Sequence, residues 1–289
     1  MFLRPEEFNK EPPLRIVFLS VEGNKTEHNY FQWVEKYREQ LGIKTGVHVH
    51  SLRRAANDNL SAPEHVLELL EEYIEIRESK ILPERMRAVI PTEFTDDFVK
   101  LYMEDAEAVD KTKKEQFEMI LQQAGIDLDY DYFLKEYSSE YDVFGIVIDR
   151  DYGNHSVTQM NRIVKECKEK GYEYFITTPC IEFWLLMHLV DVSSEYKDDM
   201  ENFRDNLKKS NKHTFTSYEV SKRAGHAKEI SEDIFKKFYL SQVDFAIQQV
   251  KESFATDITE LIGTDDSEDT KKGKLGSNLP DLFRLLREK

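Results

Sequence analysis

One stretch, residues 141–154 with the sequence YDVFGIVIDRDYGN, constrains the fold of this chain more than any other. Residues 143–148 are apolar apart from Gly145, and the run ends in two carboxylates, Asp149 and Asp151. A short apolar run of this kind is typical of a buried strand, and the two acids are spaced at the period of a strand. The sequence therefore predicts a buried strand that carries paired acids to one edge of a sheet.

A second stretch has the same design. Residues 15–21, RIVFLSV, are apolar after Arg15, and Glu22 and Gly23 follow them directly. Further strands are expected at residues 46–52 and 172–178. Segments with helical spacing of apolar residues separate the strands, at 26–41, 63–80, 156–171 and 179–190. Alternation of this kind predicts an α/β fold with a mostly parallel sheet and helices on both faces.

The alternation of strands and helices breaks twice. Residues 81–137 contain acidic helical segments and are expected to form a helical insertion within a core at 14–195. Residues 196–289 are expected to form a mainly helical C-terminal region, which either stands apart or wraps the core. Within it, the segment IGTDDSEDTKKGKLGSN, residues 262–278, is expected to be a mobile loop.

The acids at the two strand ends suggest one metal site. Ligands of open parallel sheets bind outside the carboxyl ends of the strands, where Glu22, Asp149 and Asp151 are expected. Hard oxygen ligands suit Mg²⁺ or Mn²⁺ and leave positions open for water and phosphate oxygens. The chemistry implied is phosphoryl transfer or phosphodiester hydrolysis. The competing interpretation is a turn that carries solvated acids.

Charge and composition limit the classes of protein to which this chain could belong. Lys and Arg total 40 against 56 Asp and Glu, a net charge of −16, whereas bare nucleic-acid binders lean basic. An acidic chain can still bind nucleic acid through a local patch and a divalent cation, together with a partner. No apolar run approaches the ~20 residues that cross a bilayer, and residues 1–13 lack a secretory signal. We expect a soluble, cytoplasmic protein whose two cysteines, Cys167 and Cys180, are core thiols.

Three blocks of sequence resemble the RloB-like family. They are, in order, residues 21–31 (VEGNKTEHNYF), residues 146–154 (IVIDRDYGN) and residues 177–189 (TTPCIEFWLLMHL). The last segment, KLGSNLPDLFRLLRE, is similar to the end of these proteins. The resemblance implies a Toprim-like, Rossmann-like domain in a bacterial protein encoded beside a RloA-type ATPase. Such pairs belong to restriction-modification or abortive-infection loci.

The resemblance also assigns roles to the acids. It implies that Glu22 is the Toprim glutamate, a metal ligand or general acid or base, and that Asp149 and Asp151 hold Mg²⁺. Arg150 points away from the aspartates on an ideal strand and is expected to form a structural ion pair. Glu27 is interpreted as a first-turn acid favoured by the helix dipole.

Five further residues are candidates near this site. Lys25 and Thr26 are candidate phosphate contacts, with a loop lysine and a helix N-cap as the alternatives. Glu182 either joins the metal cluster or binds a backbone group, because a carboxylate among leucines is costly alone. His155 is a candidate phosphate contact or a solvent-exposed loop histidine. His188 is a candidate substrate contact or a core histidine.

The sequence leads to two main hypotheses. The first is a Toprim-type nuclease that cuts RNA, with tRNA as one candidate, or DNA, in antiphage defence with a RloA-type ATPase. The second is a non-catalytic module that binds a nucleotide or its ATPase partner. A phosphatase is disfavoured because Glu22 stands where such an enzyme needs a nucleophilic Asp. A homo-oligomer is a further expectation. A basic cluster in the C-terminal region consists of Lys222, Arg223, His226 and Lys228. It either contacts nucleic acid or forms a solvated helical face.

Overall fold

The protein is an α/β structure built on one five-stranded sheet. The computed structural model describes residues 15–23, 25–52, 62–79, 81–82, 84–124, 141–225 and 229–288. The strand order is β2-β1-β3-β4-β5, with the first four strands parallel and β5 antiparallel to β4. The strands are β1 (Arg15–Val21), β2 (Val47–Leu52), β3 (Val143–Asp149), β4 (Glu173–Thr178) and β5 (Gly276–Ser277). The predicted fold class, a mostly parallel sheet flanked by helices, is confirmed and is consistent with a Rossmann-like Toprim fold.

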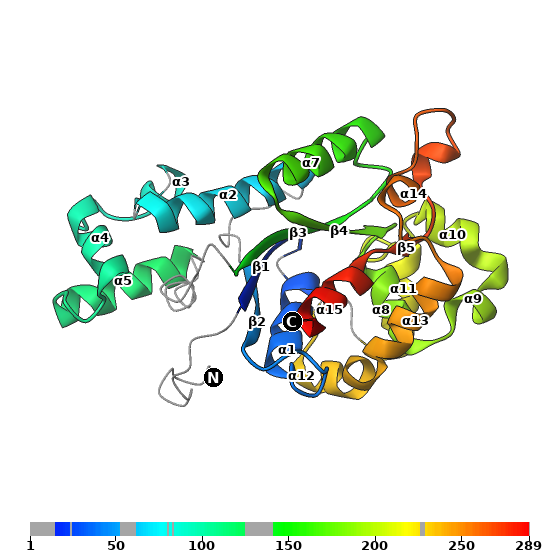
Figure 1. Cartoon of the computed structure of the whole chain (residues 1–289), viewed down its shortest axis with the longest axis horizontal. Helices are drawn as coiled ribbons and strands as arrows, with labels where there is room; N and C mark the ends of the chain where they lie inside the picture. Colours follow the sequence, from blue (N-terminus) through cyan, green and yellow to red (C-terminus); the bar gives the residue numbers. More distant parts are fainter. Residues whose placement is uncertain are drawn as a thin grey trace.

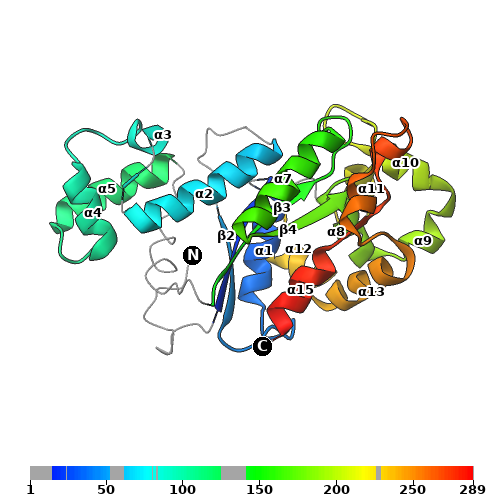
Figure 2. The same cartoon turned by 45° about the horizontal axis from the view of Figure 1, so that its top comes forward.

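Helices cover both faces of this sheet (Figures 1 and 2). On one face lie α2 (Pro63–Ser79), α7 (Val157–Lys170) and α14 (Ile258–Ile262). On the other lie α1 (Thr26–Lys36), α8 (Ile181–Leu189) and α15 (Leu279–Arg287), backed by α11 (Phe215–Ala224) and α13 (Val243–Ser253). The shorter helices are α9 (Val192–Glu195), η2 (Lys197–Asp199), α10 (Met200–Asp205), α12 (Glu232–Ile234), η3 (Phe235–Tyr239), η4 (Leu240–Gln242) and η5 (Thr270–Lys272).

The strands read as continuous apolar runs because both faces of the sheet are buried. In β1, Val17 and Leu19 pack into the core beneath α1 and α8, and Ile16 and Phe18 pack into the core beneath α2 and α7. Both cores therefore depend on one central strand. Val21, the last residue of this strand, pairs with Val147, and β3 runs two residues further to Asp149.

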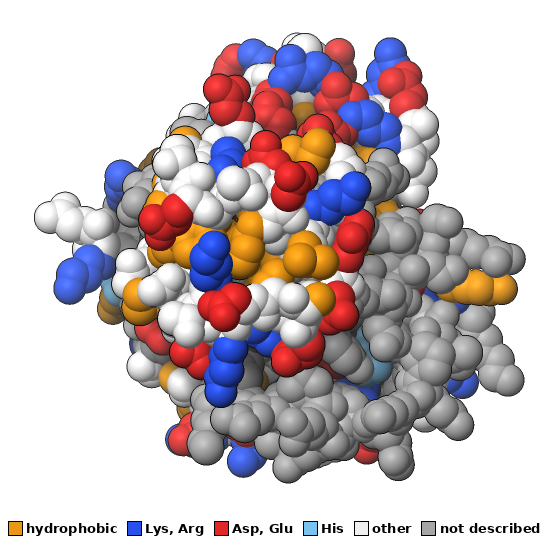
Figure 3. All heavy atoms as spheres, turned by 90° about the vertical axis from the view of Figure 1, so that its left-hand side faces the viewer, with side chains coloured by type: hydrophobic (Ala, Val, Ile, Leu, Met, Phe, Trp, Pro, Cys, Tyr) orange, Lys and Arg blue, Asp and Glu red, His pale blue; other side chains and the backbone are white. Residues whose placement is uncertain are grey.

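The insertion extends away from the sheet. It contains α3 (Glu84–Arg87), α4 (Asp96–Glu104) and α5 (Lys111–Ala124), at the left of Figure 1. Figure 3 looks onto this side of the molecule, where apolar side chains lie among Lys, Arg, Asp and Glu side chains. The exposed apolar residues of the insertion include Val89, Leu101 and Met119. None of the described helices is long and apolar enough to cross a membrane.

The C-terminal residues return to the sheet. β5 pairs with the end of β4, and the Asn278 side chain accepts from Ile176 N and donates to Tyr174 O. At the other end of the sheet, Arg287 Nε donates to Leu41 O. The last strand and helix are thus built into the layer that carries the predicted site, while the predicted boundary near 195 stays a prediction.

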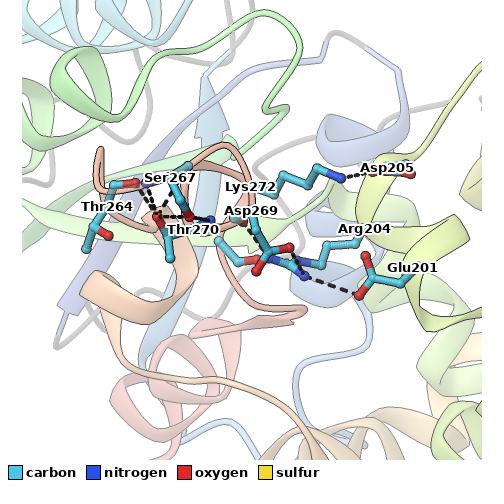
Figure 4. A network of polar contacts seen from close by, with 9 residues as sticks. Glu201, Arg204, Asp205, Thr264, Ser267, Asp269, Thr270 and Lys272 are labelled. Carbon is cyan, nitrogen blue, oxygen red and sulfur yellow. Dashed lines mark hydrogen bonds and ion pairs between the residues drawn. The ribbon is translucent and has the colours of Figure 1, made fainter.

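The predicted mobile loop is instead fastened at several points. Arg204 of α10 donates to the backbone oxygens of Gly273 (2.9 Å) and Asp269 (2.5 Å), and Lys272 pairs with Asp205. Within the loop, Thr270 Oγ1 donates to Thr264 O at 3.0 Å. Figure 4 shows these contacts, which join the loop to α10. The expectation of mobility is wrong because it considered the polar sequence of the loop without its distant partners.

Candidate metal centre

Two strand ends bring Glu22 and Asp149 together. β1 and β3 are neighbours, and Glu22 N donates to Val147 O at 3.2 Å. The Glu22 side chain then turns toward the next strand, where its Oε2 accepts a hydrogen bond of 3.0 Å from Asp149 N. The predicted meeting of these two acids at the carboxyl edge of the sheet is therefore what the structure shows.

The start of α8 brings two more side chains to Asp149. Asp149 Oδ1 accepts a hydrogen bond of 2.8 Å from Ile181 N, in the first turn of that helix. This contact sets Cys180 and Glu182 beside the aspartate. The ligand atoms of Asp149, Cys180 and Glu182 lie within 4.8 Å of one another, a group that could hold a metal ion.

A fourth acid, Glu27, completes the site from α1. Its side chain is buried against Gly23, where an added Cβ would lie only 2.1 Å from Glu27 Oε2. Burial raises the pKa of Asp149 well above its ordinary value, and the charges of Glu22, Glu27 and Glu182 raise it further. These four carboxylates are called the acidic cluster below. Like charges that share a desolvated site are costly unless protons or a cation compensate them.

The acidic cluster fits a hard divalent cation. Carboxylate oxygens are the ligands that Mg²⁺ and Mn²⁺ prefer, whereas a thiolate favours softer metals. Burial raises the pKa of the Cys180 thiol, and the charges of Glu182 and Asp149 raise it further, so that the thiol stays protonated. Its Sγ accepts a contact of 3.4 Å from Asn206 Nδ2. Oxygen atoms are thus the principal donors of this site.

The comparison with family models identifies the family. Residues 17–262 match the model described as RloB-like protein. The chain belongs to the RloB-like family. The match runs from within β1 to the end of α14 and includes every residue of the acidic cluster. Neither a curated protein nor a solved structure matches the chain.

In this RloB-like protein, Asp151 lies beyond the end of β3 and outside the group of ligand atoms formed by Asp149, Cys180 and Glu182. β3 ends at Asp149, and the backbone then turns through a left-handed conformation at Asp151, with φ 29°. The Asp151 carboxylate accepts a hydrogen bond of 2.6 Å from Asn154 Nδ2. The spacing of a strand therefore does not continue to the second aspartate, and its role as a metal ligand beside Asp149 stays a prediction.

His155 lies against Glu22 instead of in solvent. Its side chain is 5% exposed, and its Nε2 is 3.7 Å from Glu22 Oε1. Among the described residues, neither ring nitrogen has a hydrogen-bond partner. The alternative of an exposed loop histidine is therefore wrong, and the ring faces the acidic cluster of this RloB-like chain.

Arg150 anchors the turn that follows β3. It is fully buried, and its guanidinium donates to His155 O (2.6 Å), Ile262 O (2.6 Å) and Lys271 O. The expected ion pair is absent among the described residues, because backbone carbonyls take the place of a carboxylate. This arginine ties the edge of the site to the C-terminal loop.

The remaining candidates of the RloB-like chain have other roles. α1 begins at Thr26, so the N-cap residue is the exposed Lys25, and the predicted capping by Thr26 is wrong. Lys25 borders the site and stays a candidate contact. His188 is 2% exposed, with Tyr30 Oη at 3.2 Å from Nε2 and Trp184 O at 2.9 Å from Nδ1. Burial lowers the pKa of His188 to about 4, so it is a neutral core residue and not a substrate contact.

The sequence did not indicate two members of the site. Glu27 looked like an ordinary first-turn acid, and Cys180 looked like a core thiol. The signal for Glu27 was the neighbouring Gly23, because a residue without Cβ permits close approach of another side chain. The position of Cys180 depends on how α8 sits over the end of β3, which no local pattern records.

Proposed function

We propose that this RloB-like protein is a metal-dependent nuclease that hydrolyses phosphodiester bonds. The observation that carries the proposal is the acidic cluster at the carboxyl ends of β1 and β3, where ligands of parallel sheets bind. Carboxylates that converge on one desolvated point suit a cation and its phosphate ligands. Acids that only stabilised the fold would not need to converge on one point.

Each acid has a distinct part in this proposal. Asp149 and Glu182 would hold Mg²⁺ or Mn²⁺, and the cation supplies positive charge opposite the scissile phosphate. Glu22 is oriented by the hydrogen bond from Asp149 N to its Oε2, so Oε1 is free to accept a proton from the attacking water. The buried His155 ring beside Oε1 limits the directions from which water reaches it.

The wider role rests on the family alone. We extend the proposal to antiphage defence, in which a RloA-type ATPase is the partner that senses infection and controls the cut. RNA, including tRNA, and DNA are the candidate substrates. Regulated cutting agrees with a chain whose net charge is −16, since such a chain repels nucleic acid over most of its surface.

Cleavage by the purified protein tests the proposal. Labelled tRNA, single-stranded RNA, and single- and double-stranded DNA are incubated with Mn²⁺, Mg²⁺ or EDTA, with and without the ATPase. We expect cleavage of at least one substrate that depends on the metal and is lost in Glu22→Gln, a variant that keeps the shape of the side chain. An intact set of substrates under every condition, together with tight binding of the ATPase, would favour the non-catalytic module.

A further inference from the structure

A short hairpin joins α10 to α11 and projects from the C-terminal part of the chain. It spans residues 206–214 and is closed by a bridge between Lys208 and Thr214. Lys209 N donates to His213 O at 2.9 Å, and Phe215 N donates to Leu207 O at 2.9 Å. These backbone bonds hold the hairpin in one shape, so its side chains are presented from a defined surface.

The base of the hairpin touches the metal centre. Asn206 Nδ2 contacts Cys180 Sγ at 3.4 Å, and Asn206 Oδ1 accepts from Thr216 N and Oγ1. α11 packs on α8, the helix whose first turn carries Glu182. The hairpin therefore lies beside the acidic cluster, at the end of the sheet opposite the insertion (Figure 1).

The hairpin is basic in an acidic protein. Its lysines are Lys208, Lys209 and Lys212, and residues 206–218 contain no acid. Lys208 and Lys212 are exposed and form no ion pair with a described residue, whereas Lys209 lies 3.6 Å from Glu219. By contrast, the lysines of the C-terminal loop are all paired, with Glu268, Asp205 and Glu260 as partners (Lys271, Lys272 and Lys274). Lys208 and Lys212 are therefore exposed cations of the hairpin that pair with no acid in the described part of the chain.

An aromatic ring stands beside Lys209, the third lysine of the hairpin. Tyr218 of α11 is 42% exposed, and Lys209 Nζ lies 4.8 Å from the centre of its ring. The His213 ring is perpendicular to that of Tyr218, at 6.4 Å between centroids. An exposed ring among cations suits an unpaired base, because a base can stack on the ring while its phosphates meet the lysines.

We propose that the hairpin and Tyr218 hold a single-stranded stretch of nucleic acid and lead it to the acidic cluster. The inference rests on the proposed nuclease function and names the form of its substrate. A duplex keeps its bases stacked and cannot use the ring of Tyr218. An acidic peptide offers carboxylates to the lysines but no base that stacks on the ring of Tyr218. Lys222 and Arg223, predicted as part of a basic patch, are instead paired with Glu219 and Glu195.

Binding without hydrolysis tests the hairpin. Fluorescence anisotropy in EDTA measures the Kd of the full-length protein for labelled single-stranded RNA, single-stranded DNA and duplex DNA. In the Lys208→Gln, Lys212→Gln double variant we expect the single-strand Kd to rise about tenfold. The slope of log K against log salt should fall by about 1.4, or ~0.7 for each phosphate that a lysine no longer neutralises. The matched control is Lys111→Gln with Lys113→Gln on the distant α5, which should bind within about twofold of wild type.

Tyr218 provides an independent test. Tyr218→Ala should weaken single-strand binding about tenfold, while Tyr218→Phe keeps the ring and should bind like wild type. Equal losses in the hairpin and α5 variants, no loss in either, equal binding of duplex, or no binding by wild type would each overturn the proposal. Thermal unfolding checks that each variant is folded. Because EDTA prevents cleavage, a protein that binds through the hairpin but never cuts would refute the nuclease proposal and leave the hairpin as a binding site.

Discussion

Asp149→Asn should abolish metal-dependent cleavage and yet make the metal-free protein more stable. The amide keeps an oxygen that accepts from Ile181 N, so the start of α8 stays in place. It removes one negative charge from the acidic cluster, and this lowers the affinity of the cluster for the cation. Loss of several kcal/mol of charge stabilisation corresponds to a fall in rate of about 1,000-fold or more.

The sign of the stability change follows from the raised pKa of Asp149. Because the folded-state pKa lies above the unfolded value, ionisation of this carboxyl costs the folded state free energy. The cost is absent below the unfolded pKa, grows as the pH rises toward the folded pKa, and is then fully present. At neutral pH and in EDTA, Asp149→Asn should raise Tm by about 2–4 °C, the shift for roughly 1 kcal/mol in a domain of this size.

Thermal unfolding with EDTA and with Mn²⁺ measures both effects. Wild type should gain stability on adding Mn²⁺, and Asp149→Asn should not. The control is Asp198→Asn, which removes an exposed carboxylate and should behave as wild type. A lower Tm for Asp149→Asn in EDTA would contradict the claim that the carboxylates of the acidic cluster repel one another. An undiminished response to Mn²⁺ would contradict the claim that the cluster binds the cation.

Arg150→Met should have the largest effect on stability. The methionine fills much of the space but leaves three carbonyl oxygens without their donors, those of His155, Ile262 and Lys271. Each buried acceptor left unsatisfied costs about 1–3 kcal/mol, so we expect a loss of about 3–5 kcal/mol in the free energy of unfolding. Urea unfolding measures it.

The matched control for Arg150 is Arg284→Met. Arg284 is exposed and pairs with Asp281 at 3.1 Å on the surface, and its loss should change the free energy of unfolding by less than about 1 kcal/mol. Similar losses in the two variants would show that the three carbonyl contacts of Arg150 do not anchor the C-terminal loop.

The sequence predicted the central strands of the sheet better than the short edge strand and the start of α8. β1 and β3 were predictable because a strand buried on both faces must be apolar throughout, and their acids follow at once. β5 is only Gly276 and Ser277, too short for any period, and it exists because the chain returns to β4. The helical segment expected at 179–190 begins two residues later, since α8 starts at Ile181.

The site was predictable as far as local spacing describes it. Glu22 and Asp149 lie where the strand ends place them, on adjacent parallel strands. Asp151 departs from the strand period because the backbone turns after β3, and Glu182 enters because α8 packs over that turn. These two outcomes depend on tertiary packing, as does the inward position of His155, which Arg150 holds through a carbonyl.

An anomalous difference map of crystals grown with Mn²⁺ is the most direct test of the metal centre. We predict a peak at the carboxyl end of β3, with carboxylate oxygens of Asp149 and Glu182 at about 2.1 Å. The peak should disappear in Asp149→Asn crystals grown in the same way. A map without a peak at the acidic cluster, or with Mn²⁺ bound only to other surface acids, would contradict the assignment of this site as a metal centre.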